Sequence, residues 1–151
     1  MEKIVIQSDM ANLIEVERFV ANVCDTYNIN NYAATISMSL LQAVENAIVH
    51  GNHSDATKTV TVVADYVKGG VSFVVEDQGN GFDFAQYGSM PMEEGRGTGI
   101  FLMKSLSDHL SFDNNGRTVK MEFFINGIDA ARALERRVTL HNFYSSKLVN
   151  A

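Results

Sequence analysis

Two hydrophobic periodicities divide the chain into helical and extended segments. Apolar residues recur every three or four positions over residues 13–23 and 36–48, which is the spacing of one buried helix face. Over residues 59–76, β-branched residues dominate on both sides of Gly69-Gly70, a pair that favours a tight turn. These segments therefore predict two amphipathic helices followed by a β-hairpin.

The same patterns predict the elements of the whole chain. The expected strands are residues 4–6, 59–67, 71–76, 111–113 and 118–124, and the expected helices include 13–23, 32–50, 98–107 and 129–151. Helices and hairpins are segregated, which predicts an α+β fold. We expect a two-layer sandwich in which helices cover one face of a mixed, mostly antiparallel sheet. Residues 1–125 should form the domain. Residues 126–151 should be its C-terminal helical extension, either packed against it or free to bind a partner.

Composition narrows the classes of function. Of the 151 residues 46% are hydrophobic, enough for one domain with a buried core, and 12 basic against 18 acidic residues give a net charge of −6. An acidic chain is a poor general binder of nucleic acid, which leaves protein partners and small ligands. The single cysteine, Cys24, excludes an intramolecular disulfide, and no apolar run is long enough to span a membrane. We expect a cytoplasmic protein.

A first candidate site lies on the second predicted helix. Gln42, Asn46 and His50 are spaced four residues apart, so they share one face of a helix, away from its apolar stripe. Such a polar face is often simply solvated. An amide oxygen is nevertheless a suitable ligand for Mg²⁺, a hard cation that prefers oxygen. Asn46 is therefore a candidate metal ligand.

A second candidate site follows the strand at residues 71–76, which runs directly into residues 77–83 (DQGNGFD). The glycines permit left-handed backbone conformations and a close approach to a ligand. An aspartate at a strand end, here Asp77, can accept a hydrogen bond from an exocyclic amine such as that of adenine. The alternative is an ordinary glycine turn with a solvated aspartate.

A third candidate site is the glycine-rich start of the next helix, residues 95–99 (GRGTG). Unpaired N–H groups and the positive end of the helix dipole at such a start favour a phosphate group. Arg96 would add positive charge. The spacing of the glycines matches neither the Walker A motif nor the dinucleotide-binding fingerprint.

Taken together, the three motifs resemble the GHKL (Bergerat) superfamily of histidine kinase-like ATPases. The closest resemblance is to the anti-sigma factor serine/threonine kinases, and it lies in the sequences of residues 46–52 (NAIVHGN), 77–83 and 95–103 (GRGTGIFLM). Residues 116–121 (GRTVKM) are similar to the closing strand of that branch. The resemblance covers about residues 4–125. It implies a Bergerat-type sandwich that binds ATP and Mg²⁺ and regulates transcription as an anti-sigma factor.

The resemblance also implies roles for individual residues at the metal ion and at the adenine base. Asn46 would hold the Mg²⁺ that bridges the ATP phosphates. Asp77 would accept a hydrogen bond from the adenine amine, and Thr118 would support Asp77. Gly79 and Gly81 would line the adenine side of the site.

At the phosphate end, the resemblance assigns the remaining residues. Arg96, Gly97, Thr98 and Gly99 would place the start of the helix against the phosphates. Residues 84–94, which contain Met90, Met92 and the only proline of the chain, would form a lid over the nucleotide.

The chain departs from the family pattern at Gln42, where the family places a catalytic glutamate. Glutamine cannot take a proton, so phosphoryl transfer should be slowed. The resemblance therefore leaves two functions open. One is a serine/threonine kinase that phosphorylates an anti-anti-sigma (STAS-type) protein, and the other is an ATP-binding module that sequesters a sigma factor or another partner. A histidine kinase catalytic domain is a third, less favoured reading. The branch commonly forms homodimers.

Overall fold

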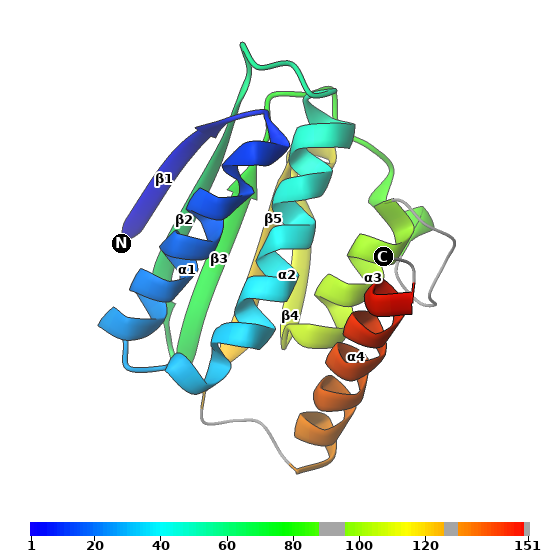
Figure 1. Ribbon diagram of the computed structural model, residues 1–151. Coiled ribbons are helices and arrows are strands. Elements are labelled where there is room, and N and C mark those ends of the chain that lie inside the picture. The colour runs from blue at the N-terminus through cyan, green and yellow to red at the C-terminus, as the bar shows by residue number, and fades with distance from the viewer. Residues whose placement is uncertain (88–95, 126–129, 150–151) are drawn as a thin grey trace.

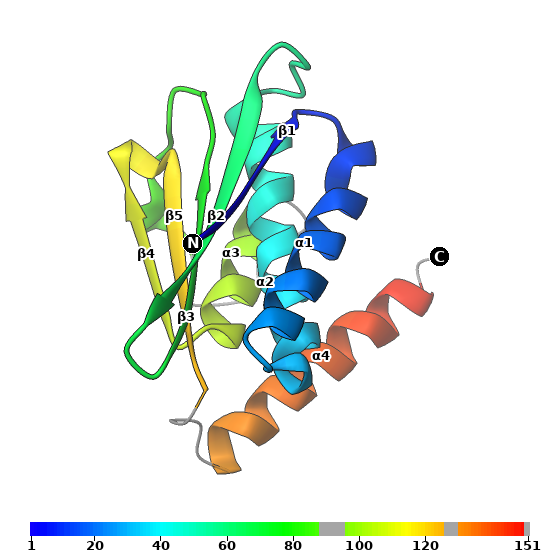
Figure 2. The same cartoon turned by 90° about the vertical axis from the view of Figure 1, so that its left-hand side faces the viewer.

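The computed structural model describes residues 1–87, 96–125 and 130–149. Five strands form one sheet: β1 (Glu2–Gln7), β2 (Thr59–Val67), β3 (Gly70–Glu76), β4 (His109–Asp113) and β5 (Thr118–Phe124). The α-helices are α1 (Leu13–Thr26), α2 (Ala33–Asn46), α3 (Arg96–Leu106) and α4 (Ala130–Val149). Figure 1 shows α1 and α2 lying over the sheet, roughly along its strands, and Figure 2 shows that the helices gather on one face of it. The predicted two-layer α+β sandwich is confirmed.

The sheet has the strand order β1-β2-β3-β5-β4, and each of the four pairings between these strands is antiparallel. The two predicted hairpins, β2-β3 and β4-β5, are both present. Strand β5 lies between β3 and β4, so the end of β3 meets the start of β5, with Glu76 paired to Thr118. This pairing brings the segment after β3 next to the segment before β5.

The core lies between the sheet and the helices. Alternate residues of the three central strands face the helices, as the period of two along a strand requires. The strands contribute Val60, Val62, Ala64, Val71, Phe73, Val75, Val119, Met121 and Phe123, and α1 and α2 contribute Val16, Val20, Val23, Ile36, Leu40 and Val44. The predicted apolar stripes of both helices are therefore confirmed, and Cys24 is a buried core thiol.

Helix α2 does not end as predicted. Residues 32–50 were expected to form one regular helix, but the α-helical part stops at Asn46 and continues as a π-helical turn, Ala47–Gly51. The N–H of Asn52 donates to the carbonyl of Ala47, five residues back, at 2.8 Å. A π turn holds one more residue than an α turn, and such turns are frequent at functional sites. Because of this turn, the four-residue spacing from Asn46 to His50 no longer defines one face.

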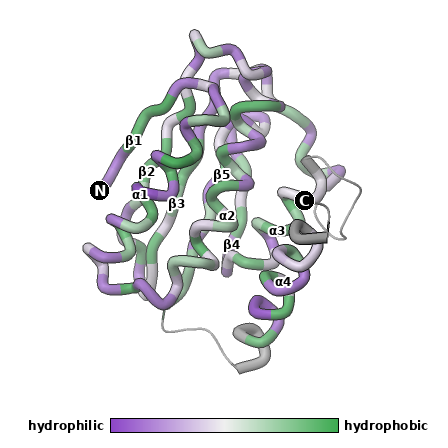
Figure 3. Tube along the Cα trace, viewed as in Figure 1, coloured by the Kyte–Doolittle hydropathy of each residue, from purple (hydrophilic) through white to green (hydrophobic). Residues whose placement is uncertain are grey.

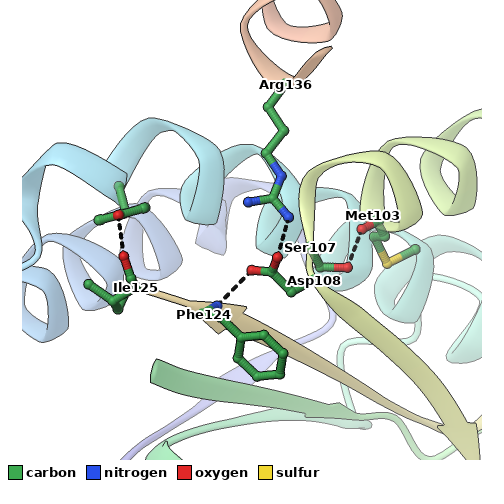
Figure 4. Close-up of polar contacts among 7 residues, drawn as sticks. Met103, Ser107, Asp108, Phe124, Ile125 and Arg136 are labelled. Carbon is green, nitrogen blue, oxygen red and sulfur yellow. Dashed lines mark hydrogen bonds and ion pairs between the residues drawn. The ribbon is translucent and has the colours of Figure 1, made fainter. Parts of the chain in front are cut away.

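A buried ion pair joins the C-terminal helix α4 to Asp108, which lies between α3 and β4. The Arg136 guanidinium lies 2.8 Å from Oδ1 of Asp108, and the other carboxylate oxygen of Asp108 accepts from the N–H of Phe124 at 2.6 Å (Figure 4). The two side chains are 6% and 1% exposed. By contrast, Leu134 and Val138, the apolar residues that share one side of α4, are exposed.

Hydrophobic and hydrophilic positions are mixed along α4, as Figure 3 shows. Among the described residues, no helix combines the length and apolar character needed to cross a bilayer.

Candidate functional site

A pocket lies between α2, α3 and the ends of β3 and β5. Its volume is about 20 Å³, which is close to the space of a single water molecule. It is lined by Ala43, Asn46, Ala47, Val75, Asp77, Phe82, Met103, Phe112, Gly116, Arg117 and Val119. Asn46 and Asp77, predicted from two separate motifs, thus share one pocket.

Asp77 follows the last residue of β3, and its backbone and side chain are both held. Its N–H donates to the carbonyl of Arg117 at 3.0 Å, which continues the β3-β5 ladder by one bond. Its Oδ1 accepts from the N–H of Gly79 at 2.8 Å. On the helix side the carboxylate lies against Gly51, where a Cβ atom would come within 2.5 Å of the Asp77 carboxyl carbon. The carboxylate is therefore placed by the loop in front of it and by the π turn behind it.

The glycine at the start of α3 allows the close approach of α3 to α2. A Cβ atom on Gly99 would lie 3.1 Å from Nδ2 of Asn46 and 3.2 Å from Oε1 of Gln42. The structure therefore brings Gln42, Asn46 and Gly99 together. Gly97 is buried and Thr98 is half-buried, while the side chain of Arg96 lies outside the described residues.

Gly79 and Gly81 are glycines for reasons of packing. A Cβ atom on Gly79 would clash with the carbonyl oxygen of Gly51. Gly81 has a φ of 82°, a left-handed conformation that suits glycine, and packs against the carbonyl oxygen of Asn115. Neither residue is among those that line the pocket, so their visible role is to let the loop after Asp77 lie close to its neighbours.

The structure does not bring Thr118 to Asp77. Thr118 pairs with Glu76, and cross-strand partners share one face of a sheet. Its neighbour Val119 is buried on the face that the helices cover, so Thr118 points to the opposite, uncovered face, where its hydroxyl accepts from Nδ2 of Asn114 at 2.9 Å. The residue that reaches the pocket is Arg117, whose Nε donates to the carbonyl of Asn114 at 3.0 Å. The sequence therefore placed the pocket residue one position too late, because Arg117 and not Thr118 reaches the pocket.

An aromatic cluster forms the wall of the pocket at β4, and sequence reasoning missed it. Phe82 and Phe112 line the pocket with their rings perpendicular and their centroids 5.7 Å apart. Phe84 stacks on Phe112 at 4.8 Å, and Phe82 also contacts Tyr87. The sequence did not predict this cluster because Phe112 is far from residues 82–87 in the chain. The β4-β5 hairpin brings it next to them in the fold.

Part of the predicted lid can be placed. Residues 84–86 form a short 3₁₀ turn capped by Asp83, whose carboxylate accepts from the N–H of Ala85. Stacking of Phe84 on β4 therefore anchors the first residues of the lid segment to the pocket wall. Met90 and Met92 lie outside the described residues.

Comparison with known proteins agrees with this geometry. The model of the histidine kinase-like ATPase domain family matches residues 6–123, which is most of the chain. The chain belongs to this family. The match includes all three motifs and every strand that contributes to the pocket.

Several curated relatives are anti-sigma F factors. The chain is 30% identical to the anti-sigma F factor of Clostridium perfringens strain SM101 over 122 residues, covering 75% of this chain and 85% of that protein. It is 30% identical over 103 residues to the anti-sigma F factors of strains ATCC 13124 and 13, covering 64% of this chain and 71% of each relative. The resemblance inferred from the three motifs is therefore confirmed.

Proposed function

We propose that this protein is an ATP-binding anti-sigma regulator. Membership of the histidine kinase-like ATPase family and similarity to anti-sigma F factors over most of their length support this function. The observation that carries the proposal is the shared pocket of Asn46 and Asp77, with the glycine-rich start of α3 packed directly on Asn46. A base-recognition group and a phosphate-binding helix start thereby belong to one site.

In this proposal Asp77 recognises the adenine and α3 receives the phosphates. The Asp77 carboxylate accepts a hydrogen bond from the exocyclic amine, with its own position held by the N–H of Gly79. The aromatic wall of Phe82 and Phe112 supplies apolar surface for the base. Backbone N–H groups in the first turn of α3 receive the phosphates, where the helix dipole favours negative charge.

Asn46, beside the start of α3, fits a magnesium ion that arrives with the nucleotide. Mg²⁺ takes oxygen ligands and keeps several waters, so one or two protein oxygens together with substrate phosphates are enough. The Asn46 amide supplies such an oxygen next to Gly99. When bound, the ion would offset the phosphate charge. Gln42 lies beside Asn46 and, like Asn46, is neutral, so neither of these two side chains offsets the charge of the ion.

Two versions of the regulatory role differ in whether phosphate is transferred. In the first, the protein is a serine/threonine kinase that phosphorylates a STAS-type anti-anti-sigma partner in the cytoplasm. In the second, it binds ATP with weak turnover and regulates by sequestering a sigma factor. The second is favoured by Gln42, because an amide holds the place beside Asn46 where a general base would be expected to act. Either version is compatible with a homodimer.

Binding of a fluorescent ATP analogue with and without Mg²⁺ tests the proposal. We expect Mg²⁺-dependent binding by the wild type and a loss of at least tenfold in affinity in Asn46→Ala. Asn22→Ala is the matched control, because Asn22 is exposed on α1, outside the pocket. Absence of binding by the wild type would overturn the nucleotide site, and equal binding by wild type and Asn46→Ala would overturn the role of Asn46.

A further inference from the structure

Asn52, the residue after the π turn, is a buried amide that joins three parts of the chain. Its side chain is 0% exposed. Oδ1 accepts from the N–H of Gln78 at 2.8 Å, and Nδ2 donates to the carbonyl of Thr59 at 3.0 Å and to the hydroxyl of Ser8 at 2.8 Å. One side chain therefore connects the end of β1, the start of β2 and the segment after β3.

The orientation of this amide is fixed by its backbone partners. The N–H of Gln78 can only donate, so the atom facing it must be the amide oxygen, and the carbonyl of Thr59 can only accept, so it must face the nitrogen. Both N–H groups and one oxygen lone pair of Asn52 are used. Loss of the side chain would leave a donor and two acceptors without this partner, which is costly in a buried place.

The loop after β3 is held twice at the same point. Besides the bond from its N–H to Asn52, Gln78 accepts through Oε1 from the N–H of Thr59 at 2.7 Å. Gln78 is the residue directly after Asp77, so its backbone position determines where the Asp77 carboxylate can lie. The chain is thus clamped immediately beyond the carboxylate.

The same residue also fixes the other side of Asp77. Asn52 directly follows Gly51, whose Cα lies against the Asp77 carboxylate. The N–H of Asn52 closes the π turn on Ala47, a pocket residue. Its backbone therefore holds the wall behind Asp77 while its side chain holds the loop in front. Asn52 itself does not line the pocket.

We propose that Asn52 is a positioning residue that sets the location of the Asp77 carboxylate and thereby the preference of the site for a purine with an exocyclic 6-amine. The inference rests on the proposed nucleotide site. Asn52 acts through Gln78 and Gly51 and makes no contact with the nucleotide. Removing it should weaken the recognition of the amine more than the recognition of the rest of the nucleotide.

The test compares affinity for ATP with affinity for purine riboside triphosphate, which lacks the 6-amine. We expect the wild type to prefer ATP and Asp77→Ala to lose the preference. Asn52→Ala should bind ATP about tenfold more weakly, which corresponds to about 1.4 kcal/mol. Its affinity for purine riboside triphosphate should stay within about twofold of the wild type. A purely structural role would instead lower both affinities equally, through the folded fraction.

Two further variants separate position from stability. Ser8→Ala removes one bond of the Asn52 amide and leaves its bond to Gln78, so stability should fall and the preference for ATP should remain. Asn52→Asp keeps an acceptor for the N–H of Gln78, so it should also retain the preference, at lower stability. If Asn52→Ala does not fold, Asn52→Asp decides: retained preference supports the inference and lost preference overturns it.

The outcomes distinguish this inference from the proposed function. If the wild type prefers ATP, Asp77→Ala loses the preference and Asn52→Ala keeps it, Asn52 is not a positioning residue while the adenine site stands. If the wild type shows no preference, or Asp77→Ala keeps one, the adenine site and the role of Asn52 both fall.

Discussion

Gly51 and Asp77 touch so closely that a single methyl group does not fit between them. A Cβ atom on Gly51 would lie 2.5 Å from both the carboxyl carbon and Oδ2 of Asp77. Gly51 has no left-handed backbone conformation that would itself require glycine. The three atoms nearest to such a Cβ all belong to the Asp77 carboxylate, so the requirement for glycine ties the end of the π turn to the proposed adenine-binding residue.

This contact predicts the effect of Gly51→Ala. The methyl group should push the Asp77 carboxylate away, lower the free energy of unfolding by about 1–3 kcal/mol, and weaken ATP binding. Adding Asp77→Ala should restore most of the lost stability, because the opposing group is gone, while ATP binding stays weak. Urea unfolding of the two single variants and the double variant measures this coupling. Additive losses of stability would contradict the contact.

The neutral side chain beside Asn46 predicts the effect of Gln42→Glu. If the protein acts in a kinase-type reaction, a carboxylate there should raise phosphoryl transfer to a STAS-type partner by about 10²–10⁴-fold. Transfer of labelled γ-phosphate measures the rate. Gln7→Glu, which adds the same charge at an exposed position of β1 outside the pocket, should leave the rate unchanged. An unchanged rate in Gln42→Glu would show that the missing carboxylate does not limit turnover.

The buried ion pair predicts that α4 contributes to stability through Arg136. Arg136→Ala should lower the free energy of unfolding by about 3–5 kcal/mol, because Asp108 would keep a buried charge without its cation. Arg137→Ala removes the same type of side chain from an exposed neighbouring position and should change stability by about 0.5 kcal/mol or less. Denaturant unfolding compares the two. Equal, small effects would show that α4 is not held by this pair.

The buried thiol predicts slow labelling of the native protein. Burial raises the pKa of the Cys24 thiol, because a thiolate is poorly solvated in the core. The stability gained from the neutral thiol is present below the pKa of an unfolded cysteine and declines as the pH rises towards the native value. At pH 8 a thiol reagent should therefore label the native protein far more slowly than the unfolded chain. Saturating Mg-ATP should slow labelling further, because a ligand that binds the folded state suppresses opening.

Most of the fold could be predicted from the sequence because its main helices and strands have clear hydrophobic periods. The alternation in β2 and β3 and the helical stripe of α1 bury the residues that the pattern places inside. The meeting of Asn46 and Asp77 was predictable only from the resemblance of the motifs, since nothing in either segment alone specifies the other. The two-layer architecture then follows, because each apolar face needs a partner.

The errors have local causes. Thr118 was assigned to the pocket although its face depends on the register of β5, and a shift of one residue exchanges the faces of a strand. The π turn was missed because Ala47 and Ile48 are buried there as they would be in a regular helix. Asn52 and Arg136 were overlooked because polar residues of these types are usually exposed, and their partners lie far away in the chain.

The position of β5 inside the sheet has a consequence for synthesis of the protein. Asn46 and Asp77 leave the ribosome well before the segment at Arg117 that completes their pocket. Until β5 emerges, β3 has an open edge that can pair with another chain, and such an edge favours aggregation. The nascent protein therefore completes its proposed nucleotide pocket and covers the open edge of β3 in the same late step.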